Sequence, residues 1–463
     1  MKKTISFPVV TLFLLISLLS AGVTFSRNAN DPAAGWRAGV ARTLITPQEP
    51  MWMAGYAFRD HPAEGTVNDL WAKALILEDM KGNRALLITT DIESFPKYTS
   101  DRIRNRIKET YGLEKAQIIL NGSHTHSGPV IQGMYDVIYT NDPGELKKVR
   151  DYSLKFEDKI VALVGEAIKS MKPAQIYSQN GVTRFQVNRR NNSEKDFLKQ
   201  TEIKGPNDYA VPVLKITDAS GTMMAVAFGY ACHNTTLSAY EWCGDYAGFA
   251  QEELEKMHPG LTAMFFQGAG ADQNPIPRGT VALARQYGKT LAAATERVLS
   301  EEMHELKPII KTRYSEIKLE FEKPMTKDEL KKIISESEGY IKSWAEDYLQ
   351  RNEKDQPIMT SYKYPLQIWK LGDQAIIGMG GEVVVDYAIK LKQTFGQDIF
   401  VMGYCNDVMA YIPTAETLKE GGYEGAISQM AFGLPAVWKA NIETEIIDEI
   451  HRLARKTGMK KVN

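Results

Sequence analysis

Short apolar runs rich in branched residues alternate with longer helical runs along most of the 463-residue chain. Gly, Asn or Asp bounds each short run, as is usual for β-strands. This alternation predicts an α/β protein in which helices cover mixed sheets. The expected strands are 73–77, 85–90, 117–120, 211–216, 224–230, 263–266, 374–378 and 399–404. The expected helices are 100–109, 146–171, 281–299, 327–349 and 440–456.

The chain contains no linker rich in Pro, Ser or Gly, no internal repeat and no low-complexity segment. One large domain over residues 27–463 is therefore expected rather than two. The charged helix at 327–349 begins with Thr326 and Glu329, which have the spacing of a capping box. We expect this helix to be a solvated cover of the domain.

The first 26 residues have the layout of a secretory signal peptide. Lys2 and Lys3 precede an apolar run that ends near Ala21, and small residues follow it. A membrane anchor is the alternative, but Pro8 interrupts the run and disfavours it. We expect cleavage near residue 26 and export to the periplasm or the medium.

Composition narrows the class of function. The hydrophobic share of 43% and the charged share of 24% are typical of a soluble globular protein. A net charge of −1 leaves no positive surface excess for a nucleic acid partner. The three cysteines, Cys232, Cys243 and Cys405, are too few for a disulfide framework. Whether Cys232 pairs with Cys243 stays open.

Two histidines follow the expected strand 117–120, in the segment Asn-Gly-Ser-His-Thr-His-Ser-Gly-Pro of residues 121–129. Alternate residues of an extended chain share one face, so the imidazoles of His124 and His126 are expected to point at the same spot. Ends of strands are where open α/β sheets place their ligand sites. The motif favours a metal site modestly over a pair of hydrogen-bonded structural histidines.

Two further candidate ligands also follow apolar runs. His233 comes after the expected strand 224–230, and Glu382 emerges from a glycine turn after 375–377. Catalytic zinc typically takes three protein ligands from His, Glu, Asp or Cys and keeps a position open for water. Together with the histidine pair, these residues predict a zinc site. The alternatives are a buried, hydrogen-bonded role for His233 and a helix N-terminal charge at Glu382.

A glycine-rich segment at 267–277 follows another expected strand. It lacks the Lys-Ser/Thr ending of a phosphate-binding loop. Glycines allow close approach of the backbone to a ligand, so we expect a loop that lines the site with Asp272 and Asn274. A plain tight turn is the alternative.

Taken in order, these motifs resemble the neutral/alkaline non-lysosomal ceramidases, a family of zinc amidases that split ceramide into sphingosine and a fatty acid. The most specific element is Ser-His-Thr-His-Ser-Gly-Pro at 123–129, and the likeness extends from about residue 39 to about residue 425. The other elements are 39–47, 53–56, 187–189, His233, 244–245, 267–275 and 406–425.

The resemblance implies roles for individual residues and one Zn²⁺ ion per chain. The implied zinc ligands are His124, His233, Glu382 and Tyr411. His126 is implied to lie beside the metal, where it transfers protons, and Arg189 and Tyr423 are expected to hold the oxyanion. The residues expected against the substrate are Asn188, Asp272 and Asn274.

Two features depart from the family pattern. Asn274 stands where the family has a serine next to the scissile bond. The chain also ends about where the family's catalytic domain ends, so the resemblance implies that domain without the C-terminal immunoglobulin-like one.

The expected function is zinc-dependent hydrolysis of the amide bond of ceramide or a related N-acyl lipid. A zinc esterase or amidase of the same fold that acts on a glycan or another exported nutrient is the alternative. A catalytically silent binding protein is the third hypothesis. The expected partners are a small-molecule or lipid-like substrate and, transiently, membrane lipid.

Overall fold

One large mixed sheet carries the first two thirds of the chain. Its strands follow the order β11-β9-β8-β6-β1-β3-β4-β5, and β13 pairs with β6. The bounds are β1 Trp36–Leu44, β3 Trp71–Glu78, β4 Arg84–Thr90, β5 Ile118–Gly122, β6 Lys172–Val182, β8 Ala210–Asp218, β9 Met223–Tyr230, β11 Thr262–Gln267 and β13 His304–Glu305. Strands β4, β9 and β11 are apolar and buried along nearly their whole length, because other layers cover both faces of the sheet.

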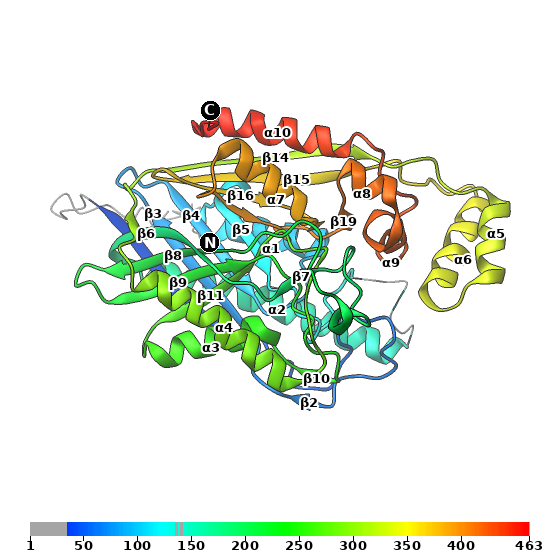
Figure 1. Cartoon of the computed structure of the whole chain (residues 1–463), viewed down its shortest axis with the longest axis horizontal. Coiled ribbons are helices and arrows are strands. Elements are labelled where there is room, and N and C mark those ends of the chain that lie inside the picture. The colour runs from blue at the N-terminus through cyan, green and yellow to red at the C-terminus, as the bar shows by residue number, and fades with distance from the viewer. Residues whose placement is uncertain (1–34, 135–137, 139–141, 463) are drawn as a thin grey trace, which may run out of the picture. The chain divides into compact units, whose positions relative to one another are not determined.

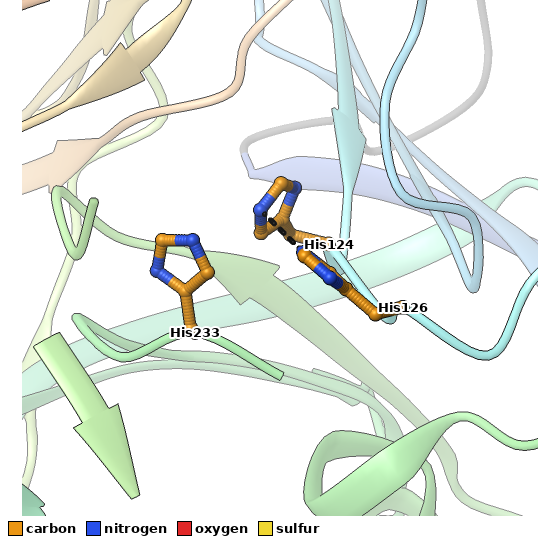
Figure 2. A group of neighbouring side chains, drawn as sticks. All are labelled: His124, His126 and His233. Carbon is orange, nitrogen blue, oxygen red and sulfur yellow. Dashed lines mark hydrogen bonds between the residues drawn. The ribbon is translucent and has the colours of Figure 1, made fainter. Parts of the chain in front are cut away.

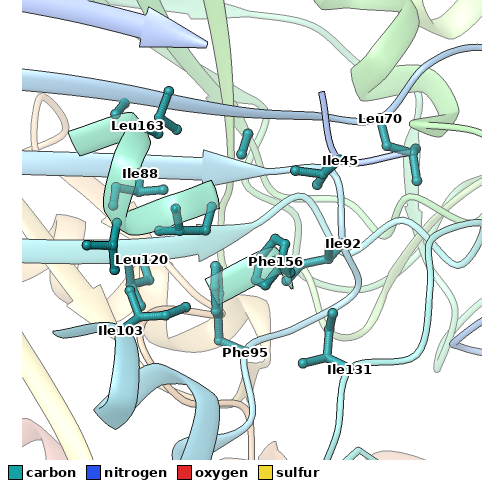
Figure 3. Close-up of a cluster of buried hydrophobic side chains, with 14 of the residues drawn as sticks. Ile45, Leu70, Ile88, Ile92, Phe95, Ile103, Leu120, Ile131, Phe156 and Leu163 are labelled. Atoms are coloured by element: carbon teal, nitrogen blue, oxygen red, sulfur yellow. The ribbon is translucent and has the colours of Figure 1, made fainter. Parts of the chain in front are cut away.

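Helices cover one face of this sheet in two groups. Near β4 and β5, Ile103 of α1 and Phe156 of α2 pack against Ile88 and Leu120 (Figure 3). Each such buried side chain contributes about 1.5–3 kcal/mol to folding. Helices α3 and α4 cover the β9–β11 end. These helices span α1 Lys97–Tyr111, α2 Pro143–Lys169, α3 Asp245–Met257 and α4 Val281–Leu299.

A second, four-stranded sheet packs on the opposite face. Its order is β14-β15-β16-β18, and Trp369 and Ile376 from it share a buried cluster with Ile119 and Met264 of the large sheet. Helices α7 and α10 cover its outer side, as Figure 1 shows. The bounds are β14 Ile310–Glu320, β15 Ser361–Leu371, β16 Gln374–Met379, β18 Phe400–Met402, α7 Val385–Phe395 and α10 Ile442–Thr457.

The side chain of Asn121, at the end of β5, joins the ends of three strands. Its Oδ1 accepts a hydrogen bond from the backbone N–H of Gln267 at 2.8 Å, and its Nδ2 donates to the carbonyl of Gly403 at 2.8 Å. The loops that follow β5, β11 and β18 therefore start from one buried point. These loops carry His124, Asn274 and Tyr411 of the site described below, whereas His233 and Glu382 follow β9 and β16.

The remaining elements are short pieces of sheet and helix. The strands are β2 Gly65–Thr66, β7 Gln186–Asn188, β10 Glu241–Trp242, β12 Gln273–Pro275, β17 Glu382–Val383 and β19 Tyr411–Ile412. The helical elements are η1 Lys115–Gln117, η2 Phe197–Lys199, α5 Lys327–Glu336, α6 Gly339–Glu353, α8 Ala415–Glu420, the π-helical turn η3 Tyr423–Ile427 and α9 Ser428–Ala431.

This architecture comes from a computed structural model that describes residues 35–134, 138 and 142–462. Gly35–Asn463 forms one compact unit. The predicted signal peptide lies outside the described residues. Among the helices that the structure describes, none is long and apolar enough to cross a membrane.

The predicted α/β class with mixed sheets covered by helices is confirmed. Each expected strand is present, with ends shifted by one or two residues. The expected single helix 327–349 is wrong: α5 ends at Glu336 and α6 begins at Gly339, because Ser337 and Glu338 between them are extended. The predicted capping box of Thr326 and Glu329 begins α5. All three cysteines are free thiols, so Cys232 and Cys243 do not pair.

Candidate metal centre

Three buried imidazoles meet where the loops after β5 and β9 come together (Figure 2). His124 Nε2 lies 3.1 Å from His126 Nε2, and one ring nitrogen of His233 lies within 4.8 Å of both. His124 and His233 are fully inaccessible to solvent. The two loops are joined by backbone pairing between Thr125 and Asn234. The three histidines that the sequence singled out therefore share one place.

The histidine pair converges for a different reason from the one predicted. The expected extended strand ends at Gly122, and His124 adopts a left-handed φ of 62°. The two rings lie at 81° to each other. The prediction that they share the face of a strand is wrong, because the left-handed backbone of His124, and not β-pleating, brings them together.

Backbone carbonyl groups fix the orientation of two of the imidazoles. His124 Nδ1 donates to the carbonyl of Glu93 at 3.1 Å, and His233 Nδ1 donates to the carbonyl of Gly270 at 2.9 Å. A carbonyl oxygen can only accept, so in the neutral rings Nδ1 carries the hydrogen and Nε2 presents a lone pair. This arrangement is the usual one for metal-binding histidines.

Glu382 and Tyr411 reach the same point from the other end of the chain. Parallel pairing of β17 with β19 places the two residues directly opposite each other. Glu382 Oε2 lies 3.2 Å from Nε2 of both His124 and His233, and the Tyr411 hydroxyl lies 3.2 Å from His233 Nε2. Gly381 makes the turn with a φ of 73°, where a Cβ would lie 2.5 Å from an Ile412 side-chain atom.

The electrostatics of this group call for a positive charge at its centre. Burial lowers the pKa of His124, but Glu382 and Glu93 together outweigh burial and the net shift is upward. Burial raises the pKa of Glu382, but the two histidines hold it well below its usual range. Burial and Arg189 lower the pKa of His233 to about 4. Two nitrogen lone pairs and two oxygens from four side chains form a donor set that fits zinc.

His126 lies beside this donor set and has different surroundings. Burial, together with His124 and His233, lowers its pKa well below 6.5, so the ring is neutral at pH 7. Its Nδ1 has no hydrogen-bond partner among the described residues, and Glu93 Oε1 lies 3.8 Å from its Nε2. Gly55 packs directly against the ring: a Cβ there would lie 2.3 Å from His126 Cγ. His126 is therefore a neutral base within reach of the centre.

Arg189 lies beside Tyr411 and is held by three partners. Its guanidinium donates to the Tyr411 hydroxyl at 3.0 Å, to Glu424 Oε1 at 2.7 Å and to Asn274 Oδ1 at 3.3 Å. Burial lowers the pKa of Arg189, but Tyr411 and Glu424 raise it well above its usual value. The ring of Tyr423 packs 5.4 Å from that of Tyr411 and is 43% exposed.

These groups line a cleft of about 480 Å³. Of the residues expected against the substrate, Asn274 lines it, whereas Asn188 and Asp272 lie behind it. Asn188 Nδ2 donates to Asp272 Oδ2 at 2.8 Å, and the backbone N–H of Arg189 donates to the Asp272 carbonyl at 2.8 Å. Burial raises the pKa of Asp272 to about 6. Asn188 and Asp272 thus position Arg189 from behind.

Sequence reasoning missed three contributors to the centre. Glu93 orients His124 through its carbonyl, Tyr404 donates a hydrogen bond to Glu382 Oε2 at 3.3 Å, and Gly55 makes room for His126. Glu93 follows β4, so an acidic residue after an apolar strand was an available signal for it. No comparable local pattern marks Tyr404 or Gly55.

Comparison with known proteins finds relatives along most of this chain. The family described as "Neutral/alkaline non-lysosomal ceramidase, N-terminal" matches residues 36–277. That segment contains His124, His126, Arg189 and His233, and it ends before Glu382.

Individual relatives are distant in sequence and longer than this chain. Neutral ceramidase from Pseudomonas aeruginosa is 24% identical over 319 residues, which cover 62% of this chain and 46% of that protein. Neutral ceramidase B from Dictyostelium discoideum is 27% identical over 228 residues, 45% of this chain and 31% of that protein. The matched part therefore spans less than half of each relative.

The fold is similar to a solved structure. The crystal structure of neutral ceramidase from Pseudomonas aeruginosa superimposes with a TM-score of 0.71 at 18% sequence identity. The superposition covers 93% of this chain and 76% of that one. At 93% of the chain, the likeness in fold extends well beyond residue 277.

Proposed function

This chain belongs to the neutral/alkaline non-lysosomal ceramidase family, and on that premise we propose that it is a zinc-dependent amidohydrolase of N-acyl compounds. The observation that carries the proposal is the convergence of the Nε2 atoms of His124 and His233 on Glu382 Oε2, each at 3.2 Å. The names of the relatives make ceramide, or a related N-acyl lipid, the first substrate to test.

The chemistry begins with the ion that the donor set fits. Four side chains would hold it: His124, His233, Glu382 and Tyr411. When bound in such a site, zinc lowers the pKa of water to about 7 and so supplies a nucleophile for an acyl carbon.

Proton transfer falls to His126. Its ring is neutral at pH 7 because its pKa is lowered, so Nε2 can accept a proton from the attacking water. Protonated His126 can then pass that proton to the nitrogen of the departing amine. The packing of Gly55 against the ring keeps the imidazole directed at the centre.

Stabilisation of the developing oxyanion falls to Arg189 and Tyr423. Arg189 is fixed by Glu424 and Asn274 before substrate arrives, so little reorganisation is needed when negative charge forms. Asn274 can donate a hydrogen bond from Nδ2, but its amide cannot serve as a nucleophile.

The first 26 residues support export of the mature protein as a further proposal. Fractionation of producing cells tests it: the processed chain should appear outside the cytoplasm. Recovery of the full-length chain in the cytoplasm would contradict it.

The test of function combines metal analysis with amine release. Purified protein should hold about one zinc per chain, as a closed ligand set implies. Chelation should abolish release of free amine from N-acyl substrates, and added zinc should restore it. Glu382→Gln should lose zinc and turnover. Glu157→Gln is the matched control, because Glu157 of α2 is also a buried carboxylate but pairs with Arg102 of α1, outside the cleft.

Absence of zinc from both the purified and the zinc-reconstituted protein would refute the metal assignment. Full hydrolysis by protein shown to be free of metal would refute the mechanism instead.

A further inference from the structure

Tyr404 lies in the loop after β18 and is completely buried. Its backbone adopts a left-handed φ of 55°, which a residue with a bulky side chain rarely does. Its ring packs against the His124 imidazole, with 4.4 Å between the ring centroids. Its hydroxyl group donates a hydrogen bond to Glu382 Oε2 at 3.3 Å. An unfavourable backbone conformation that brings a polar group to a metal-ligand candidate indicates a role beyond filling the core.

The loop that carries Tyr404 is fixed from two sides. The backbone N–H of Tyr404 donates to the Gly381 carbonyl at 3.0 Å, and the N–H of Gly381 donates to the Asp407 carbonyl at 2.7 Å. Asn406 Oδ1 accepts from the N–H of Leu120 at 3.0 Å, and the N–H of Asn406 donates to the Leu120 carbonyl at 2.8 Å. These bonds tie the loop to β5 and to the turn that leads into β17. The Tyr404 hydroxyl is therefore held at a fixed place relative to the start of β17.

The bond between Tyr404 and Glu382 has a defined direction. A carboxylate oxygen only accepts hydrogen bonds, so the Tyr404 hydroxyl is the donor and keeps its hydrogen. Each carboxylate oxygen has about two lone pairs for such bonds. Tyr404 uses one at Oε2, the oxygen that lies 3.2 Å from Nε2 of both His124 and His233. The hydrogen bond thus fixes which oxygen of Glu382 faces the centre and leaves a lone pair there for a cation.

Two tyrosines reach the centre, and their hydrogen bonds give them different roles. The Tyr411 oxygen accepts from the Arg189 guanidinium at 3.0 Å and lies 3.2 Å from His233 Nε2, so it is an acceptor that suits a ligand. The Tyr404 oxygen acts as a donor to a carboxylate. Tyr404 therefore supports a ligand, whereas Tyr411 belongs to the ligand set.

From these observations we propose that Tyr404 is a positioning residue that holds the Glu382 carboxylate in the orientation needed to bind the metal. This inference rests on the zinc site of the proposed function and adds a residue outside its ligand set. Groups that hydrogen-bond to ligating carboxylates orient them, and their loss typically weakens metal binding by about 10–100-fold. Tyr404 acts on the ion only through Glu382.

The first experiment measures zinc affinity by competition with a chelator of known affinity. Tyr404→Phe keeps the ring that packs on His124 and removes the hydroxyl group. Its zinc dissociation constant should be about 10–100-fold above that of wild type. Tyr348→Phe is the matched control, because Tyr348 is also a buried tyrosine, but its hydroxyl donates to the Gly433 carbonyl at 2.8 Å and does not line the cleft. It should leave the zinc dissociation constant unchanged.

Thermal unfolding of the metal-free proteins separates positioning from a general loss of stability. Tyr404→Phe and Tyr348→Phe each remove one buried hydrogen bond, so the Tm of both should fall by similar amounts. Only Tyr404→Phe should also lose zinc affinity. An unchanged zinc dissociation constant in Tyr404→Phe would overturn the inference. Equal weakening of zinc binding in both variants would overturn it as well, because the effect would then follow stability.

A third result would overturn the inference in a different way. If Tyr404→Phe lost zinc as completely as His124→Ala, Tyr404 would be a ligand and not a positioning residue.

Zinc binding is measured without substrate, so this inference can fail separately from the function. If wild type binds zinc but releases no amine, the proposed hydrolase fails, and weaker zinc binding by Tyr404→Phe would still support the positioning role. If wild type hydrolyses its substrate and Tyr404→Phe binds zinc equally well, only the inference fails. Absence of zinc binding by wild type would overturn both.

Discussion

Two histidine–carboxylate groups in this molecule have similar distances and opposite surroundings. At the metal centre, His124 and His233 lie 3.2 Å from Glu382 and are fully buried. In the loop before β2, His61 lies 2.7 Å from Asp60 and 3.1 Å from Glu64, with its side chain 43% exposed. The His61 ring also stacks on Tyr240 at 3.7 Å.

The difference lies in what each ring nitrogen faces. Carbonyl groups occupy Nδ1 of His124 and His233, so Nε2 is left as a lone pair toward the carboxylate. Both nitrogens of His61 face carboxylates, and the hydrogen bond to Asp60 is the main reason that its pKa is raised. Because His61 is in contact with solvent, its own protonation is enough to balance the two neighbouring carboxylates. The buried group lacks solvent, so a shared cation is the better match.

The largest predicted effect is loss of the metal from His124→Ala. Removing an outer-shell partner weakens metal binding by about 10–100-fold, and removing a ligand should exceed that. Zinc content should fall from about one per chain toward zero, and turnover with it, as measured by atomic absorption and amine release. Retention of full zinc content would place the ligands elsewhere.

His126→Ala should separate proton transfer from metal binding. The zinc content should match wild type, while kcat should fall by about 10²–10⁴-fold, the usual contribution of a general base. The same two measurements decide the outcome. Simultaneous loss of zinc would show that His126 is a ligand as well.

Gly55→Ala should displace the His126 ring without changing the imidazole itself. The backbone there has a φ of 100°, and the new Cβ would lie 2.3 Å from His126 Cγ. A displacement on the scale of 1 Å can cost about 100-fold in rate, so kcat should fall with zinc retained. Gly82→Ala is the control, since φ is 79° but nothing lies within 4 Å of its Cβ. Equal kcat in Gly55→Ala and Gly82→Ala would contradict the proposed role of Gly55 in positioning His126.

The pKa values of His233 and His61 should be shifted in opposite directions in the metal-free protein. NMR should show His233 neutral down to about pH 4 and His61 titrating above 6.5. Between about pH 4 and 6.5 the unfolded state binds more protons at His233, so stability from that residue is lost as pH falls. Stability from His61 has the opposite sign: it is present below 6.5 and is lost as pH rises. If both rings titrated near pH 6.5, the proposed difference between the environments of His233 and His61 would be wrong.

The smallest effect is expected for His61→Ala. An exposed histidine that faces two exposed carboxylates contributes little to stability. Zinc content should be unchanged and kcat should stay within about 2-fold of wild type, as for ordinary surface substitutions. A large loss of zinc or turnover would show that the loop around His61 contributes to the metal centre.

The amino-acid sequence by itself determined the α/β class and pointed to His124, His233 and Glu382, whereas Tyr411 and Arg189 were implied by the family resemblance. Apolar runs and the polar residues that end them are local patterns, so the strands before His124 and His233 could be located without the fold. The half-exposed strands β6 and β14 were not predicted, because polar residues interrupt their apolar runs. The break between α5 and α6 was also not predicted, because it depends on two extended residues, Ser337 and Glu338, in a charged segment.

Only the tertiary structure decided how those residues meet. The pairing of Thr125 with Asn234 and the β17–β19 pairing that opposes Glu382 and Tyr411 join segments far apart in the chain. Their geometry follows from packing of two sheets through Asn121 and the loops beyond it. Local preference cannot specify such contacts, because they depend on which distant groups the core brings to the same point.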